Sequence, residues 1–189
     1  MSRPALGLLL CAPLLLSGLS APAHAEILWP RSCHATGGVG ITISESDLGF
    51  RLDGDCNEVR ITGDGVTVDA GRVQRLVIEG DDVTVRGAVL REIVVRGARA
   101  DVRASSTERL TVTGRRHRIT ITGLAERTVL RAKRSTISAR QYNFVTVTGN
   151  RNALTGKRGY DVILRGNRNT VAIADVEAVK DRGRRNRVR

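Results

Sequence analysis

Hydrophobic residues in this chain alternate with polar ones over short segments, and the pattern repeats about every 17 residues. In most repeats, apolar residues stand two and four positions before a glycine and again five positions after it. A spacing of two is the period of a β-strand, in which successive side chains point to opposite faces. The repeats are marked by Gly63, Gly80, Gly97, Gly114, Ala132, Gly149, Gly166 and Gly183.

A fixed period of this size indicates one structural unit that stacks on itself, because a single repeat cannot bury its own apolar face. We expect two short strands in each repeat, with the glycine at the corner between them, where its backbone freedom is useful. The sequence therefore predicts an all-β fold: a right-handed, single-stranded parallel β-solenoid (β-helix) with about 17 residues per coil and 8–9 coils. The alternative, an antiparallel sandwich, does not explain the constant register of the repeats.

Two further columns of equivalent positions are expected inside the coils. Ten positions after the glycine, the inward residues include Leu124 and Tyr142. Three positions after it stand Asn152, Asn169 and Asn186, and asparagines stacked in this way form side-chain hydrogen bonds between neighbouring strands. Other repeats must satisfy this corner differently. The residues there are Val66, Val83, Ala100, His117 and Ser135, of which the histidine is expected to make a structural hydrogen bond.

The strictest repeats run from Gly149 to Leu154, from Gly166 to Val171 and from Gly183 to Val188. Together with residues 55–65, which begin Asp-Cys-Asn, they make the chain similar to the bacterial domain of unknown function 3060 family, whose members look like exported chains with Val/Gly/Asn repeats after a cysteine. The resemblance covers residues 33–188. It implies an exported β-solenoid and no particular activity.

The first 25 residues have the pattern of an export signal. Arg3 supplies the positive start, an apolar stretch follows, and a small-x-small motif ends at Ala25, so cleavage is expected before Glu26. The apolar stretch is short and interrupted by Pro13, which argues against a permanent membrane span. The sequence therefore predicts an exported protein, either periplasmic or secreted.

Three regions are predicted: residues 1–25 as the signal peptide, 26–56 as an N-terminal cap with an irregular first coil, and 57–189 as the solenoid repeats. Trp29 is expected to help cover the open end of the stack, since an uncovered end is an unpaired sheet edge.

Cys33 and Cys56 are the cysteines that remain after cleavage, and in an exported chain they most simply form a disulfide. Two free buried thiols are the alternative, and no metal site is expected from their spacing.

Charge is distributed unevenly along the chain. It has 31 basic and 19 acidic residues in all. Residues 26–109 hold 11 basic and 14 acidic residues, whereas residues 110–189 hold 19 basic and 5 acidic ones. Two positions after the repeat glycine, six consecutive repeats carry an arginine. These residues are Arg99, Arg116, Arg134, Arg151, Arg168 and Arg185.

Stacked repeats would place these arginines in one basic ridge, where neighbouring like charges repel. Since a guanidinium pairs with carboxylate or phosphate through two hydrogen bonds, we expect the ridge to bind an extended anionic polymer. Candidate partners are an anionic polysaccharide, another envelope polymer or an anionic lipid surface. Nucleic acid is not expected, because few aromatic residues interleave with the arginines. The alternative is that the arginines only keep a monomeric rod soluble.

These observations predict an exported, non-enzymatic protein that acts by binding or by structure at the cell envelope, as a monomer and without a cofactor. The alternative function is a polysaccharide-active β-helix enzyme, a lyase or a hydrolase. Such catalysis needs paired carboxylates or a base beside a metal, and the sequence assigns neither catalytic residues nor metal ligands.

Overall fold

The structure is a computed structural model that describes residues 28–33 and 40–189. The described residues form β-strands and no helix. In chain order, the strands are β1 (Leu28–Ser32), β2 (Ile41–Ile43), β3 (Gly49–Ile61), β4 (Thr67–Ile78), β5 (Thr84–Val95), β6 (Asp101–Ala104), β7 (Thr107–Val112), β8 (Arg118–Leu130), β9 (Thr136–Val147), β10 (Ala153–Leu164), β11 (Thr170–Asp181) and β12 (Arg187–Val188).

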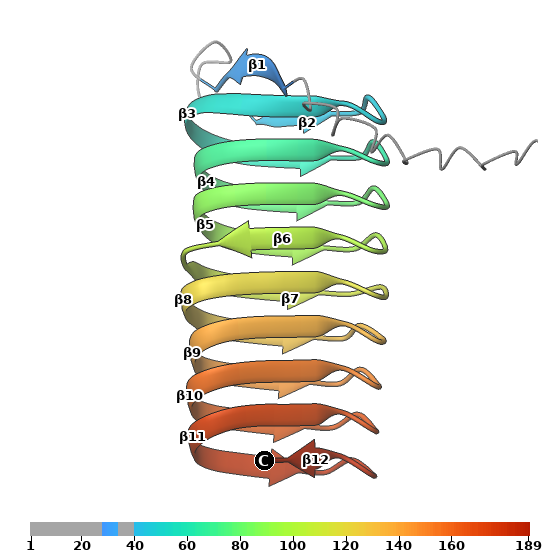
Figure 1. The fold of residues 1–189 in the computed structure, drawn as a ribbon, viewed down its shortest axis with the longest axis vertical. Helices are drawn as coiled ribbons and strands as arrows, with labels where there is room; N and C mark the ends of the chain where they lie inside the picture. Colours follow the sequence, from blue (N-terminus) through green and yellow to red (C-terminus); the bar gives the residue numbers. More distant parts are fainter. Residues whose placement is uncertain (1–27, 34–39) are drawn as a thin grey trace, which may run out of the picture.

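All of these strands pair in parallel, each with the equivalent segment of the next coil. Val68 lies beside Val85, and Leu154 lies beside Val171, each 17 residues further on. Figure 1 shows the coils stacked in one column, with the chain winding right-handed from the first coil to the last. The structure therefore confirms the predicted parallel β-solenoid, with about nine coils of about 17 residues.

Most coils contain one long strand rather than the two short strands that we expected. The strands β4, β5, β9, β10 and β11 each continue for 12 residues around the bend that lies opposite the glycine turn. Among the coils after the first, only the one that holds β6 and β7 is divided there. Parallel hydrogen bonds to the neighbouring coils thus keep the strand continuous through the bend. The spacing of the apolar residues does not show this continuity.

The core is a set of apolar columns that run along the inside of the coils. The residues two and four positions before each repeat position from Gly63 to Gly166 are buried, among them Ile78 and Leu76 in β4. The predicted column ten positions after the glycine holds for Tyr142, but Leu124 is 37% exposed, so that prediction is wrong. The strand register shifts between Ile121 and Leu124, and Ala125 takes the inward position instead. This bulge accommodates the extra residue of the 18-residue repeat.

The repeat glycines are required by close contact between coils, not by the backbone torsion that we expected. A Cβ on Gly80 would lie 2.0 Å from the carbonyl oxygen of Gly63, and a Cβ on Gly166 would lie 1.7 Å from that of Gly149. Among the glycines that mark the repeats, only Gly114 has a positive φ. The backbones of successive coils therefore touch at the positions that carry glycine, whereas the repeat with the buried Ala132 accommodates a Cβ there.

The predicted asparagine ladder is present at the buried corner that follows the glycine. The backbone amide of Asn152 donates to Oδ1 of Asn169 at 2.9 Å, and that of Asn169 donates to Oδ1 of Asn186 at 2.8 Å. The Asn169 side chain also donates through Nδ2 to the carbonyl of Gly149 at 3.0 Å. Each asparagine thus satisfies a buried amide and a buried carbonyl of neighbouring coils.

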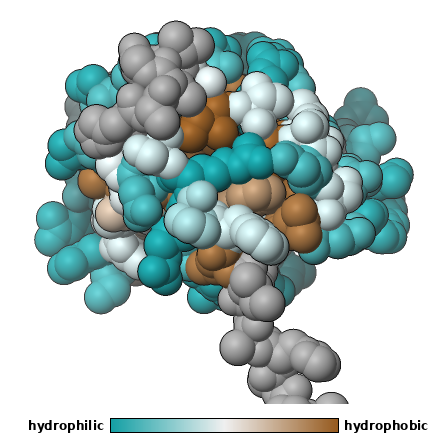
Figure 2. All heavy atoms as spheres, turned by 90° about the horizontal axis from the view of Figure 1, so that it is seen from above, coloured by the Kyte–Doolittle hydropathy of each residue, from teal (hydrophilic) through white to brown (hydrophobic). Residues whose placement is uncertain are grey.

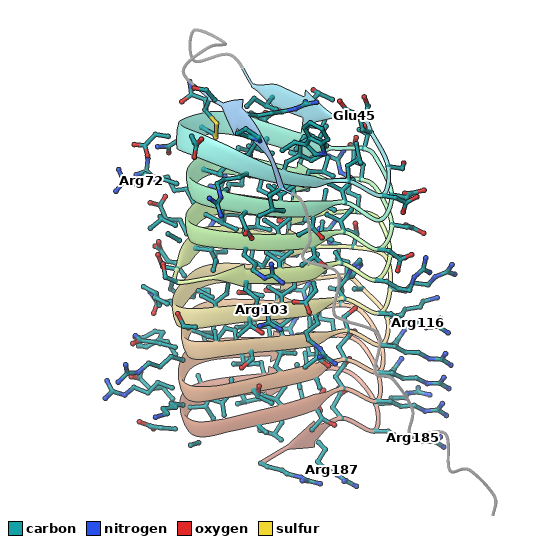
Figure 3. The ribbon with its side chains drawn as sticks, turned by 45° about the horizontal axis from the view of Figure 1, so that its top comes forward. Glu45, Arg72, Arg103, Arg116, Arg185 and Arg187 are labelled. Carbon is teal, nitrogen blue, oxygen red and sulfur yellow. A yellow bond between two sulfur atoms is a disulfide. The ribbon has the colours of Figure 1, made fainter. Side chains whose placement is uncertain are left out.

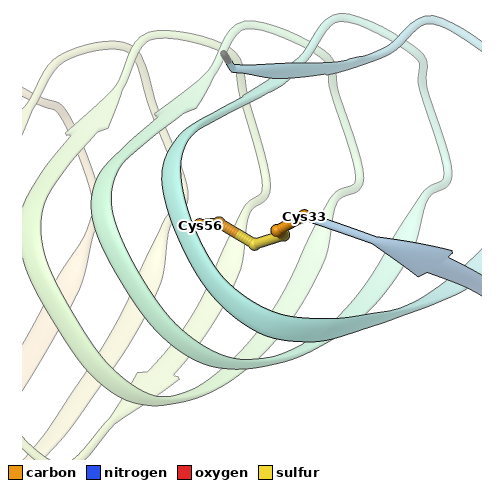
Figure 4. The surroundings of a disulfide bond; sticks show 2 residues. All are labelled: Cys33 and Cys56. Atoms are coloured by element: carbon orange, nitrogen blue, oxygen red, sulfur yellow. A yellow bond between two sulfur atoms is a disulfide. The ribbon is translucent and has the colours of Figure 1, made fainter. Parts of the chain in front are cut away.

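The N-terminal end is closed by β1, which pairs with β3, and by a disulfide between Cys33 and Cys56 with a Cα–Cα distance of 5.1 Å. Figure 4 shows this bond joining the end of β1 to the first full coil, as the sequence predicted. Arg31 pairs with Glu45 and places its guanidinium 4.6 Å from the centre of the Phe50 ring.

Trp29 lies in β1, the strand that pairs over the end of the stack, and its side chain is 57% exposed. Figure 2 shows hydrophobic residues at this end, interrupted by hydrophilic ones. The expected export signal lies outside the described residues.

Replacing Asn169 with alanine is expected to lower the free energy of unfolding by about 2 kcal/mol or more, because it leaves the buried Asn152 amide and Gly149 carbonyl without partners. Urea unfolding would measure the change. Asn167→Ala is the control: its Oδ1 accepts from the Arg184 amide at 2.8 Å in an exposed turn, where water replaces the bond. A loss in N169A no larger than in N167A would contradict this role for the ladder.

Candidate anion-binding site

Each coil closes through a short turn between the repeat glycine and the next strand, and these turns form one edge of the solenoid. The second residue after the glycine has a left-handed backbone in every repeat, with φ between 55° and 66°. We call this line of positions the turn edge. Its residues, with the equivalent position of the first coil, are Asp47, Gly65, Asp82, Arg99, Arg116, Arg134, Arg151, Arg168 and Arg185.

The arginines of the turn edge occupy a conformation that is unfavourable for them. Residues with a Cβ lose about 1–2 kcal/mol in the left-handed region, which glycine and, to a lesser degree, aspartate and asparagine tolerate. The first coils follow this preference with Asp47, Gly65 and Asp82. Those three residues are the signal from which the backbone conformation could have been predicted, and the sequence interpretation missed it.

Backbone groups of the turn edge are engaged between coils. The amide of Arg134 donates to the carbonyl of Asn150 at 3.1 Å, and the amide of Arg151 donates to that of Asn167 at 3.0 Å. Asn150 in turn accepts the Asn167 amide on its Oδ1 at 2.7 Å. A ligand at this edge would therefore be held mainly by side chains.

Five of the six predicted arginines come together along a groove, and we call these five the arginine ridge. The groove has a volume of about 650 Å³ and runs between the ridge and the residues that precede each arginine. Figure 3 shows the side chains from Arg116 to Arg185 projecting from the same edge of the coils. The groove is lined by Arg115, Arg116, Lys133, Arg134, Asn150, Arg151, Asn167, Arg168, Arg184 and Arg185.

The lining of the groove contains guanidinium, ammonium and amide groups and no carboxylate. It can bind anions and hydroxyl groups. The sequence interpretation included the turn-edge arginines but not Asn150 and Asn167. Their signal was the recurrence of Asp64, Asp81 and the two asparagines at one position, because such side chains accept backbone amides in turns.

Arg99, the first of the predicted arginines, does not belong to the ridge. It donates to Asp82 at 2.5 and 2.6 Å and lies 3.6 Å from Asp81. The hydrogen bonds from Arg99 hold the pKa of Asp82 below its usual value, and those to Asp82 raise the pKa of Arg99. The charge of Arg99 is thus compensated within the protein, and the residue lies outside the lining of the groove.

Ion pairing stops before the ridge begins. Every ion pair among the described residues lies between Arg31 and Arg109. Arg75, for example, lies between Glu58 at 3.6 Å and Glu92 at 3.8 Å on neighbouring coils. Neighbouring ridge charges about 4.8 Å apart repel by roughly 0.9 kcal/mol even at the dielectric constant of water. The described C-terminal coils provide no carboxylate at ion-pair distance to offset this.

His117 lies in the buried corner directly after the first ridge residue and replaces an asparagine there. Its Nδ1 accepts the amide of Ala100 at 3.2 Å, so its Nε2 carries the proton and donates to the Thr113 carbonyl at 2.7 Å. The neutral imidazole thus supplies one acceptor and one donor, as Asn152 does. Burial lowers the pKa of His117.

Comparison of the chain with protein-family models, with curated proteins and with solved structures found no match. Membership of the domain of unknown function 3060 family therefore stays a prediction. In the described part of the chain, no helix is long and apolar enough to cross a membrane. Within that same part, no three His, Cys, Asp or Glu side chains are grouped so that they could hold a metal ion.

Replacing Arg134 with glycine is expected to raise the free energy of unfolding by about 0.5–1 kcal/mol. The left-handed backbone costs arginine about 1–2 kcal/mol, which exceeds the roughly 0.5–1 kcal/mol that glycine loses in ordering. Arg118→Gly removes the same charge from strand β8 and is expected to destabilise. Urea unfolding of both variants tests this, and an equal loss of stability in the two would show that the ridge backbone is unstrained.

His117→Asn is expected to weaken the dependence of stability on pH. Because the folded pKa of His117 lies below its unfolded value near 6.5, its contribution is complete above that value and declines as pH falls through it. Wild-type protein should therefore lose more stability between about pH 7 and 5 than H117N does. Urea midpoints across this range measure the difference, and parallel pH profiles for the two proteins would refute the assignment.

Proposed function

We propose that this protein is an exported binding protein whose arginine ridge holds an extended anionic polymer at the cell envelope, without turning it over. The observation that carries this proposal is the set of five consecutive ridge arginines in left-handed turns, with no ion-pair partner among the described residues. The Cys33–Cys56 disulfide supports the predicted export, since such bonds persist in oxidising compartments.

Two independent costs fall on the same positions, and neither is offset by the described residues. The backbone conformation disfavours arginine, neighbouring positive charges repel, and no described acidic residue compensates them. Glycine or aspartate would fit the turn better, as Gly65 and Asp82 do in the earlier coils. Residues that oppose stability at one site are typical of a functional requirement there, and a bound polyanion would turn the repulsion into attraction.

The chemistry of the groove favours binding over catalysis. Its lining lacks the carboxylate pair that glycoside hydrolysis uses. It also lacks aromatic side chains on which bases could stack. The exposed aromatic pair Phe144 and Tyr160 has its ring centres 6.0 Å apart and contributes nothing to the groove lining. Anionic polysaccharides and other acidic envelope polymers remain the best ligands.

A binding assay with a charge-matched control tests the proposal. Polygalacturonate, hyaluronan, polyphosphate and neutral dextran would be immobilised and the protein eluted with salt. We expect wild-type protein to bind anionic polymers, with affinity that falls as salt rises, and not dextran. Changing Arg116, Arg134, Arg151 and Arg168 to glycine should weaken binding by at least about tenfold.

The control variant removes four exposed positive charges outside the groove, at Arg127, Arg140, Lys157 and Arg158, by changes to glutamine. It should retain most of the binding, because its ridge is intact. If both variants lose binding equally, net charge rather than the ridge is responsible. If wild-type protein binds none of the anionic polymers, the proposed function is wrong.

A further inference from the structure

We propose further that the ligand is a linear polyuronate that lies along the solenoid axis, with one sugar carboxylate at each arginine of the ridge. This inference rests on the proposed function and deepens it by naming the class of polymer. It follows from the spacing of the ridge charges, from their common orientation and from the two asparagines at the centre of the groove.

The ridge presents one guanidinium per coil at a constant step. Neighbouring coils lie about 4.8 Å apart, so the four steps from Arg116 to Arg185 span roughly 19 Å. The φ values of the five ridge residues lie between 55° and 59°. Nearly identical backbones direct the side chains alike, as the row from Arg116 to Arg185 in Figure 3 illustrates. The ridge is therefore a straight, evenly spaced line of positive charge.

A polyuronate offers negative charge at a similar step. A pyranose linked through opposite ring carbons advances the chain by close to one coil spacing, and in a polyuronate every sugar carries a carboxylate. Successive sugars rotate about the chain axis, so the long arginine side chains must reach carboxylates on both sides of the polymer. A polysaccharide with a carboxylate on every second sugar would meet only alternate arginines. A polyphosphate places its charges closer together than the coils, and a lipid surface spreads them in two dimensions rather than along one line.

The centre of the groove carries one cation per coil and a neutral amide beside it. Asn150 and Asn167 stand where the outer coils have Arg115, Lys133 and Arg184. Their Oδ1 atoms accept backbone amides of the next coil, whereas no described residue accepts from their Nδ2 groups. These amides are free to donate to sugar hydroxyls beside each carboxylate, an arrangement that suits a uronate better than a chain of phosphates.

Titration calorimetry with soluble oligosaccharides tests the predicted match on the full exported chain. Affinity for oligogalacturonates should rise with length until about five sugars cover the ridge, and then level off. Hyaluronan oligosaccharides with the same number of carboxylates should bind at least about tenfold more weakly. Polyphosphate of equal charge and vesicles of phosphatidylglycerol should also bind more weakly.

Two variants of equal charge separate spacing from charge number. Changing Arg134 and Arg168 to glycine leaves arginines on alternate coils, and this variant should lose its preference for oligogalacturonate over hyaluronan. Changing Arg168 and Arg185 to glycine leaves three adjacent arginines. That variant should bind more weakly but keep the preference.

Equal affinity of wild-type protein for both polysaccharides, tighter binding to polyphosphate, or equal selectivity of the two variants would overturn this inference and leave the proposed function intact. Tighter binding to vesicles than to every polymer would overturn both proposals. Failure of wild-type protein to bind any anionic ligand would remove both proposals.

Discussion

Contact between the backbones of successive coils at the repeat glycine is the constraint on which the rest of the structure depends. A Cβ on Gly166 would lie only 1.7 Å from the Gly149 carbonyl oxygen, so seven of the eight repeats place a glycine here and Ala132 is the exception. This requirement fixes the register at the turn, and extra residues are accommodated elsewhere. The described register shifts, at Leu52/Asp55 and Ile121/Leu124, both lie toward the opposite bend, within strands β3 and β8.

Because the register is fixed, the buried corner of each turn has a structural role, and the exposed turn edge can have a chemical one. The buried corner needs one acceptor and one donor, which Asn152 and Asn169 supply and which neutral His117 can imitate. The exposed turn residues exchange backbone hydrogen bonds with the next coil whatever their side chains are. Hydrogen bonding therefore does not restrict the side chains at the turn edge, and where they depart from the glycine or aspartate that suits the left-handed backbone, their identity reports on function more than on fold.

The solenoid uses this freedom differently at its two ends. In the N-terminal coils, acidic and basic residues alternate in register, as Glu58, Arg75 and Glu92 do, and their charges cancel. Arg99 marks the boundary, because it is the last turn-edge residue that pairs with an aspartate. Beyond it, the arginine ridge leaves positive charge uncompensated in a backbone conformation that disfavours arginine. Uncompensated positive charge is thereby concentrated at one half of one edge.

Periodicity alone determined the β-solenoid, the inward columns, the asparagine ladder and the line of arginines, because a constant register turns spacing in sequence into stacking in space. The disulfide followed from counting the cysteines that would remain after cleavage of the predicted export signal. Tertiary contacts decided what spacing cannot express. They place Ala125 rather than Leu124 inside, pair Arg99 with Asp82, and make the glycines necessary through close approach. Each of these depends on three-dimensional distances between coils, whereas a one-dimensional repeat specifies only which residues are neighbours.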